Sequence, residues 1–185
     1  MNREEAWNLL CEYTSNDSLR KHALAVEAAM RRYARRLGED EEKWGVTGLL
    51  HDFDYERWPN PPDHTREGSR VLREKGVDDE IVTAILSHAD WNTDEYPRDR
   101  AIRKVLFAVD ELCGFLVACA LVRPNKLEGL APKSVKKKMK TPSFAAAVSR
   151  DDIHKGAALL EIPLDEHICT CVEALQGITD DLGLA

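Results

Sequence analysis

In four segments of the sequence, a histidine or aspartate falls on the same side of the segment as its apolar residues, which is the side expected to face the core. His22 stands one helical turn before an apolar stripe, and His88 and Asp110 fall within similar stripes further along the chain. His51 and Asp52 end an apolar run that begins at residue 46. A buried carboxylate that lacks a cation or hydrogen-bond donors costs several kcal/mol, so these inward-facing groups predict a shared partner.

A divalent transition metal is the partner that suits this mixture of side chains. Imidazole nitrogens and carboxylate oxygens together favour Mn, Fe, Co, Ni or Zn over Ca, and Mg is a further candidate. An aspartate can also bridge two ions through its two oxygens, so we expect one or two ions. Taken singly, such a histidine is more often a hydrogen-bonded core residue, and such an aspartate a solvated or capping one. The hypothesis therefore depends on the combination.

The elements that must position these residues are helices. Aromatics make up only 6% of the chain, while Leu, Ala, Glu, Lys and Arg are frequent, which favours helices over strands. Periodicity and capping residues predict helices near residues 3–13, 18–37, 40–52, 64–75, 78–89, 99–122, 133–140, 143–148, 151–160 and 164–182. We expect a single all-α domain over residues 1–185, with a metal-binding core at about 18–115 and a C-terminal helical extension at about 124–185.

Charge and cysteine content limit the classes of partner and compartment. The formal net charge of -7 gives no general attraction for nucleic acid or an anionic membrane. The longest apolar run, residues 114–122, is too short to span a bilayer, and the polar N-terminus does not resemble a signal peptide. Five cysteines without a regular framework indicate reduced thiols. These features predict a cytoplasmic protein, monomeric or homodimeric, that binds neither membranes nor nucleic-acid polymers.

The order of His22, His51-Asp52 and Asp110 resembles the HD superfamily of metal-dependent phosphohydrolases. The segment Gly-Leu-Leu-His-Asp-Phe-Asp at residues 48–54 looks like the signature helix end of that family. The resemblance implies an all-α HD-domain bundle in which these four histidines and aspartates hold the first metal ion.

Two further histidines resemble the dinuclear branch of the same family. His64 lies within Asp-His-Thr-Arg-Glu-Gly, and His88 lies within Ile-Leu-Ser-His-Ala. The resemblance, which covers about residues 18–115, implies that Asp52 bridges to a second ion held by His64 and His88.

The resemblance also implies a class of reaction. Many relatives cleave phosphoester bonds, so we expect hydrolysis of a nucleotide or another small phosphorylated metabolite. In-line attack of water on phosphorus is the mechanism we expect, with Asp52 or Asp110 accepting its proton. Two alternatives remain: a di-iron HD-type oxygenase, and a non-catalytic metal-binding regulatory protein.

The residues after His-Asp depart from the family pattern. Many dinuclear relatives continue with Ile-Gly-Lys, whose lysine approaches the substrate, whereas this chain has Phe53-Asp54-Tyr55. Asp54 is a candidate outer-shell base for catalysis. A loop cap or an ion pair with Arg57 is the role that we favour for it.

A run of lysines forms a basic helix face in this acidic protein. Lys133, Lys136, Lys137 and Lys140 follow one another at i, i+3, i+4 and i+7, and Arg123 precedes them. Such a face would bind a phosphate of the substrate if it folds over the metals. A solvated charged face is the alternative that we favour.

Overall fold

The computed structural model describes residues 1–184, in which we find helices and no strand. The helices are α1 (Arg3–Tyr13), α2 (Asp17–Leu37), α3 (Glu41–Leu50), α4 (Asp63–Glu74), α5 (Asp79–His88), the 3-10 helix η1 (Asp90–Asn92), α6 (Ala101–Leu121), α7 (Pro132–Met139), α8 (Arg150–Leu159), α9 (Leu164–Gln176) and α10 (Thr179–Leu182). The predicted all-α fold is therefore confirmed.

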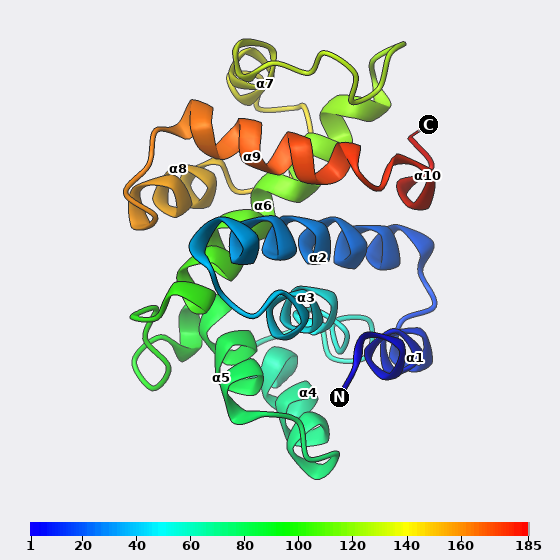
Figure 1. The fold of residues 1–185 in the computed structure, drawn as a ribbon, viewed down its shortest axis with the longest axis vertical. Coiled ribbons are helices and arrows are strands. Elements are labelled where there is room, and N and C mark those ends of the chain that lie inside the picture. The colour runs from blue at the N-terminus through cyan, green and yellow to red at the C-terminus, as the bar shows by residue number, and fades with distance from the viewer. Residues whose placement is uncertain (185) are drawn as a thin grey trace.

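Two long helices form the centre of the molecule. α2 packs against α3, α6 and α9, and α6 packs in addition against α5 and α8 (Figure 1). The C-terminal helices contribute Ile153, Ile168 and Leu175 to the same hydrophobic cluster that contains the buried residues of α2 and α6. The C-terminal extension therefore completes the core around α6 rather than forming a core of its own.

Capping residues fix where the helices that carry the histidines begin and end. Asn16 accepts hydrogen bonds from the backbone N–H groups of Ser18 and Leu19, and Gly38 ends α2 in the left-handed conformation at φ 73°. Asp40 caps α3 in the same way through the N–H of Lys43. These ends set the positions of His22 and of the residues that follow α3.

Residues 143–148 form turns instead of the predicted helix. The side chain of Arg150 donates hydrogen bonds to the carbonyls of Phe144, Ala145 and Val148, and the carbonyl of Ala145 also accepts the N–H of Val148 in a tight turn. Ala145 also has a φ of 45°, outside the right-handed helical region. The alanine-rich composition therefore gave a wrong prediction here.

Two other helices are less regular than their sequence pattern predicts. His64 and Thr65 have non-helical backbone angles, so the regular part of α4 begins only after them. The predicted helix at residues 164–182 is broken at Gly177 and Ile178 into α9 and α10. Within the described residues, no helix is both long and apolar enough to cross a membrane.

Candidate metal centre

Five helices and the residues directly after them bring all six predicted ligand residues to one place. These are His22 of α2, His51 and Asp52 after α3, His64 of α4, His88 of α5 and Asp110 of α6. Two groups of three, which share Asp52, each have potential ligand atoms within 4.8 Å of one another. The sequence alone therefore located residues that the fold places together.

The first group consists of His22, His51 and Asp52 and lies between α2, the end of α3 and α6. Asp110 of α6 lies beside it. The Nε2 atom of His22 lies 3.0 Å from Oδ1 of Asp110, and Nε2 of His51 lies 3.4 Å from the same oxygen. Nε2 of His51 also lies 3.5 Å from Oδ2 of Asp52. Two imidazole nitrogens and two carboxylates thus face a common space.

The second group surrounds the other oxygen of Asp52. Its Oδ1 atom lies 3.2 Å from Nε2 of His64 and 3.2 Å from Nε2 of His88. The imidazole rings of His64 and His88 are 5.6 Å apart, and the ring of His51 lies 5.5 Å from that of His88. The carboxylate of Asp52 therefore offers one oxygen to each group of histidines.

Backbone carbonyls orient two of the imidazoles. Nδ1 of His51 lies 2.8 Å from the carbonyl oxygen of Gly48, and Nδ1 of His88 lies 2.7 Å from that of Ile85. A carbonyl only accepts, so Nδ1 carries the proton in both rings. When these rings are neutral, their Nε2 atoms therefore present a lone pair to the site, which is the arrangement that metal-binding histidines use.

Asp54 orients the third imidazole. Its Oδ1 lies 3.0 Å from Nδ1 of His64, and its Oδ2 accepts hydrogen bonds of 2.9 Å from the N–H groups of Thr65 and Gly68. A Cβ atom at residue 68 would lie 2.6 Å from Oδ2 of Asp54, so the glycine permits this approach. Asp54 thus binds the start of α4 and holds the ring of His64.

This environment bears on the roles that the sequence suggested for Asp54. The side chain is only 1% exposed and lies behind His64, and its bonds to the N–H groups of Thr65 and Gly68 agree with the predicted capping role. The expected ion pair with Arg57 is absent, because the Arg57 guanidinium donates to the carbonyl of Glu12 instead, at 2.6 Å, and stacks on Tyr13.

Unpartnered polar atoms show that the residues fit a metal ion. Nε2 of His51 and Oδ1 of Asp52 are buried and have no hydrogen-bond partner. Oδ1 of Asp52 faces two imidazole nitrogens at a short distance without the direction of a hydrogen bond. Acceptors that face one another in this way need a cation between them, and the donor set suits a divalent transition metal.

The charges of the site lead to the same conclusion. Burial alone would lower the pKa of His51, yet the carboxylates of Asp52 and Asp110 raise it to about 9. Burial likewise opposes the charged form of His64, but Asp52 and Asp54 raise its pKa to about 10. Burial would raise the pKa of Asp52, whereas the neighbouring imidazoles, first that of His51, hold it well below its usual range. The site is strongly stabilised by positive charge.

A small acidic hollow adjoins the centre. It has a volume of about 200 Å³ and is lined by His88, Ala89, Asp90, Trp91, Phe107, Asp110, Glu111 and Asp152. The carboxylate of Glu111 accepts a hydrogen bond of 3.0 Å from the N–H of Ser149, and burial followed by the charge of Asp110 raises its pKa to about 7. Sequence analysis missed Glu111, because nothing in its neighbourhood along the chain indicates contact with residues before α8.

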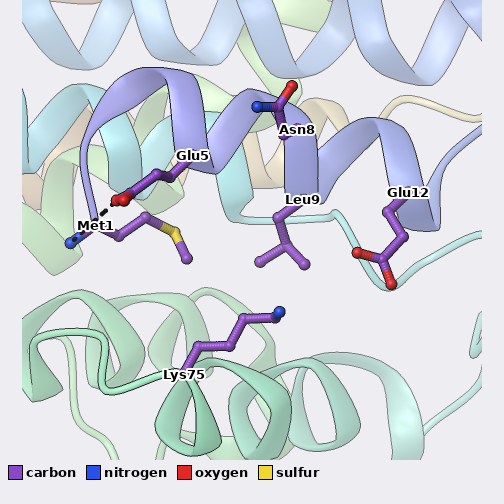
Figure 2. A pocket seen from close by; sticks show the side chains of 6 residues that line it. All are labelled: Met1, Glu5, Asn8, Leu9, Glu12 and Lys75. Atoms are coloured by element: carbon purple, nitrogen blue, oxygen red, sulfur yellow. Dashed lines mark ion pairs between the residues drawn. The ribbon is translucent and has the colours of Figure 1, made fainter.

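A larger hollow lies elsewhere. It measures about 570 Å³, lies between α1 and the end of α4, and is lined by Met1, Glu5, Asn8, Leu9, Glu12 and Lys75 (Figure 2). None of the six candidate ligands lines it. Size alone therefore does not identify the site of this protein.

The basic residues predicted to bind substrate do not lie at the metal centre. α7, which carries the lysines, packs against α9 and α6, at the opposite end of the molecule from α4 and α5 (Figure 1). Lys136 pairs with Asp165 at 2.6 Å, while Lys133 and Lys137 are exposed. Arg123 donates hydrogen bonds to the carbonyls of Lys126 and Glu128. The spacing of the lysines was sufficient to predict a helix face but gave no information on its position.

Comparison with known families agrees with this geometry. The family model of the HD domain matches residues 19–113, just over half of the chain. The chain therefore belongs to the HD-domain family. HD domains bind divalent metals, and the two histidine–aspartate clusters fit such a site. No solved structure matches the chain.

Proposed function

We propose that the protein is a metal-dependent hydrolase that cleaves a phosphoester bond of a small phosphorylated metabolite. The observation that carries the proposal is the position of Asp52, whose two oxygens face separate groups of histidines. A carboxylate shared in this way is suited to bridging two divalent ions, and such pairs hold both the attacking and the leaving oxygen in phosphoryl transfer.

The six residues would form two sets of metal ligands. His22, His51 and Asp110 would hold one ion together with Asp52, and His64 and His88 would hold a second. When bound, divalent ions lower the pKa of coordinated water and neutralise the charge of a phosphoryl group. The low pKa of Asp52 keeps this carboxylate ionised at neutral pH, so its role is ligation and charge.

Two other residues would act on the substrate or on a ligand. Glu111 lines the acidic hollow together with Asp110, so it can hold a proton beside the reacting groups. Asp54 fixes the ring of His64 through Nδ1 and so keeps Nε2 directed at the centre.

The test is metal analysis of the purified protein, followed by assays of phosphomonoesters and phosphodiesters with Mn, Fe, Co, Ni, Zn or Mg. We expect His51→Ala and Asp52→Ala each to lose bound metal and activity, while His154→Ala, a change at an exposed histidine, retains both. Full metal content in both site variants would overturn the proposal. Substrate-dependent oxygen uptake would instead indicate an oxygenase, and metal binding without either activity would indicate a regulatory role.

A further inference from the structure

A second hollow, which we call the apolar hollow, borders the metal centre at His22. It measures about 390 Å³ and is lined by Ser18, Lys21, His22, Gly114, Val117, Ala118, Leu121, Leu182 and Gly183. These residues come from α2, α6 and the end of α10. Its volume falls within the range of small-molecule sites, and His22 belongs both to this hollow and to the metal centre.

Gly114 keeps the outer edge of His22 open to this space. A Cβ atom at residue 114 would lie 3.8 Å from Nδ1 and 3.9 Å from Cε1 of His22, so a larger side chain would fill the space beside the ring. Glycine inside a helix costs about 1 kcal/mol relative to alanine. The centre of α6 thus contains a helix-weakening residue at the point where the hollow meets His22.

The wall of the apolar hollow continues to the surface. Leu121 lines the hollow and is 58% exposed, and Val122 beside it is exposed to the same extent. A single exposed apolar residue needs no explanation, but a continuous apolar wall that joins a cavity often marks a binding site. The hollow is therefore open to a ligand that carries an apolar group.

Its polar groups are few and lie on α2. Lys21 is the only lysine or arginine in the lining, and its Nζ atom pairs at 2.8 Å with the exposed Asp17. Ser18 supplies the single hydroxyl. The lining has no Phe, Tyr, Trp, Asn or Gln, which are the side chains that would stack on or read a nucleobase.

The acidic hollow is a poorer site for the body of an anionic substrate. Its volume of about 200 Å³ lies below the usual range of ligand pockets. The carboxylates of Asp90 and Asp152 line it, and when ionised they offer a phosphate no hydrogen-bond donor. A phosphoester at the metals would therefore direct the rest of its structure into the apolar hollow.

We propose that the apolar hollow binds the alcohol portion of the substrate, which is therefore a phosphate ester of an apolar alcohol rather than a nucleotide. This inference rests on the proposed hydrolase function. The phosphoryl group lies at the metal centre beside His22, and the hydrocarbon lies along Val117, Ala118 and Leu121.

The test compares methyl, butyl and octyl phosphate as substrates of the metal-loaded protein. Each methylene that leaves water is worth up to roughly fourfold in affinity, so we expect kcat/KM to rise at least about tenfold from methyl to octyl phosphate. Equal values across the series, or a preference for nucleoside monophosphates over octyl phosphate, would overturn the inference.

A matched pair of variants locates the effect. Ala118→Trp fills the hollow, so the octyl-to-methyl ratio of kcat/KM should fall to near one. Ala158→Trp makes the same change at an exposed position of α8 outside the hollow and should leave the ratio as it is. An octyl-to-methyl ratio of kcat/KM that is unchanged in Ala118→Trp would overturn the assignment. If this variant fails to fold, the comparison of the three substrates with the wild-type protein still tests the inference.

A binding experiment distinguishes a failure of this inference from a failure of the proposed hydrolase function. If no phosphoester is cleaved, the hydrolase proposal fails, but calorimetry with octylphosphonate and methylphosphonate still tests the hollow. Tighter binding of octylphosphonate that Ala118→Trp abolishes would support it. Equal affinities for octylphosphonate and methylphosphonate would overturn it. The inference would also be overturned if the protein is a dimer that Leu121→Glu dissociates while the preference for the longer chain stays the same, because the apolar surface would then be a subunit interface.

Discussion

Asp54 shows how one buried carboxylate can support both the fold and the metal centre. It orients the ring of His64 and accepts the N–H groups of Thr65 and Gly68, where the backbone of α4 is not helical. The same side chain therefore stabilises an irregular helix start and directs a candidate ligand.

Replacing Asp54 with alanine should affect both properties. Two buried N–H groups would lose their acceptor at about 1–3 kcal/mol each, so we expect the free energy of unfolding to fall by about 2–6 kcal/mol. Loss of an orienting hydrogen bond usually weakens metal binding roughly 10- to 100-fold. Urea unfolding and metal titration measure the two effects.

Asp54→Asn is the matched control for that change. Asparagine retains an acceptor for the backbone but loses the charge that faces His64, so its stability should lie between those of wild type and Asp54→Ala. Excess metal should restore activity to both variants if Asp54 acts by positioning. Activity that stays lost with full metal content would show a direct catalytic role instead.

Helical spacing explains which residues of the centre could be foreseen. The inward direction of His22, His88 and Asp110 follows from their place on apolar stripes, and no knowledge of the fold is needed. Glu111 could not be found in this way, because its hydrogen-bond partner Ser149 is 38 residues away. Pairwise contacts between distant segments are not encoded in local periodicity.

At the scale of the elements, the close approach of α8 to α6 depends on a glycine that lies near Asp110. A Cβ atom at residue 156 would lie 2.6 Å from Cα of Ala108, a backbone atom that cannot move aside. Gly156 therefore allows α8 to lie directly on α6, two residues before Asp110. Any side chain at this position must push the two helices apart.

Gly156→Ala should consequently destabilise the protein by about 1–3 kcal/mol, the usual cost of overpacking. Gly114→Ala is the same substitution on α6, but its Cβ would meet only ordinary contacts at 3.8 Å and beyond. The higher helix propensity of alanine should make that variant more stable by up to about 1 kcal/mol. Equal free energies of unfolding for the two variants would contradict this account of the contact between α6 and α8.

The elements also show where sequence patterns stop being informative. Residues 143–148 look helical by composition, yet Arg150 takes their carbonyls. The lysines of α7 share a helix face as predicted, but the packing of α7 against α9 places that face away from the metals. Both outcomes depend on tertiary contacts, whereas the ends of α2 and α3 followed from local caps.

At the scale of the whole molecule, the metal centre joins segments that are far apart in the sequence. His22 and Asp110 are 88 residues apart and meet at 3.0 Å, and the C-terminal helices pack on the far side of α2 and α6. Cations at this place would therefore connect five helices, α2 to α6. Without them, protons on the histidines must balance the carboxylates.

This balance predicts how the stability of chelator-treated protein changes with pH. The folded-state pKa values of His51 and His64, about 9 and about 10, lie above their usual 6.5. Their stabilisation is complete below about pH 6.5 and is lost as the pH rises through 9 and 10, because the folded state then releases protons that it had bound more tightly than the unfolded state. The melting temperature should therefore fall between pH 6.5 and 10.

Bound metal should remove most of this dependence, because its ligands are already deprotonated and the ion supplies the positive charge. Thermal unfolding at pH 6.5, 8 and 9.5, with chelator and with saturating metal, measures the difference, which should widen as the pH rises. His154→Ala, at an exposed histidine, should leave both curves unchanged. Parallel curves with and without metal would show that His51 and His64 do not face a cation site, and the assignment of the centre would then be wrong.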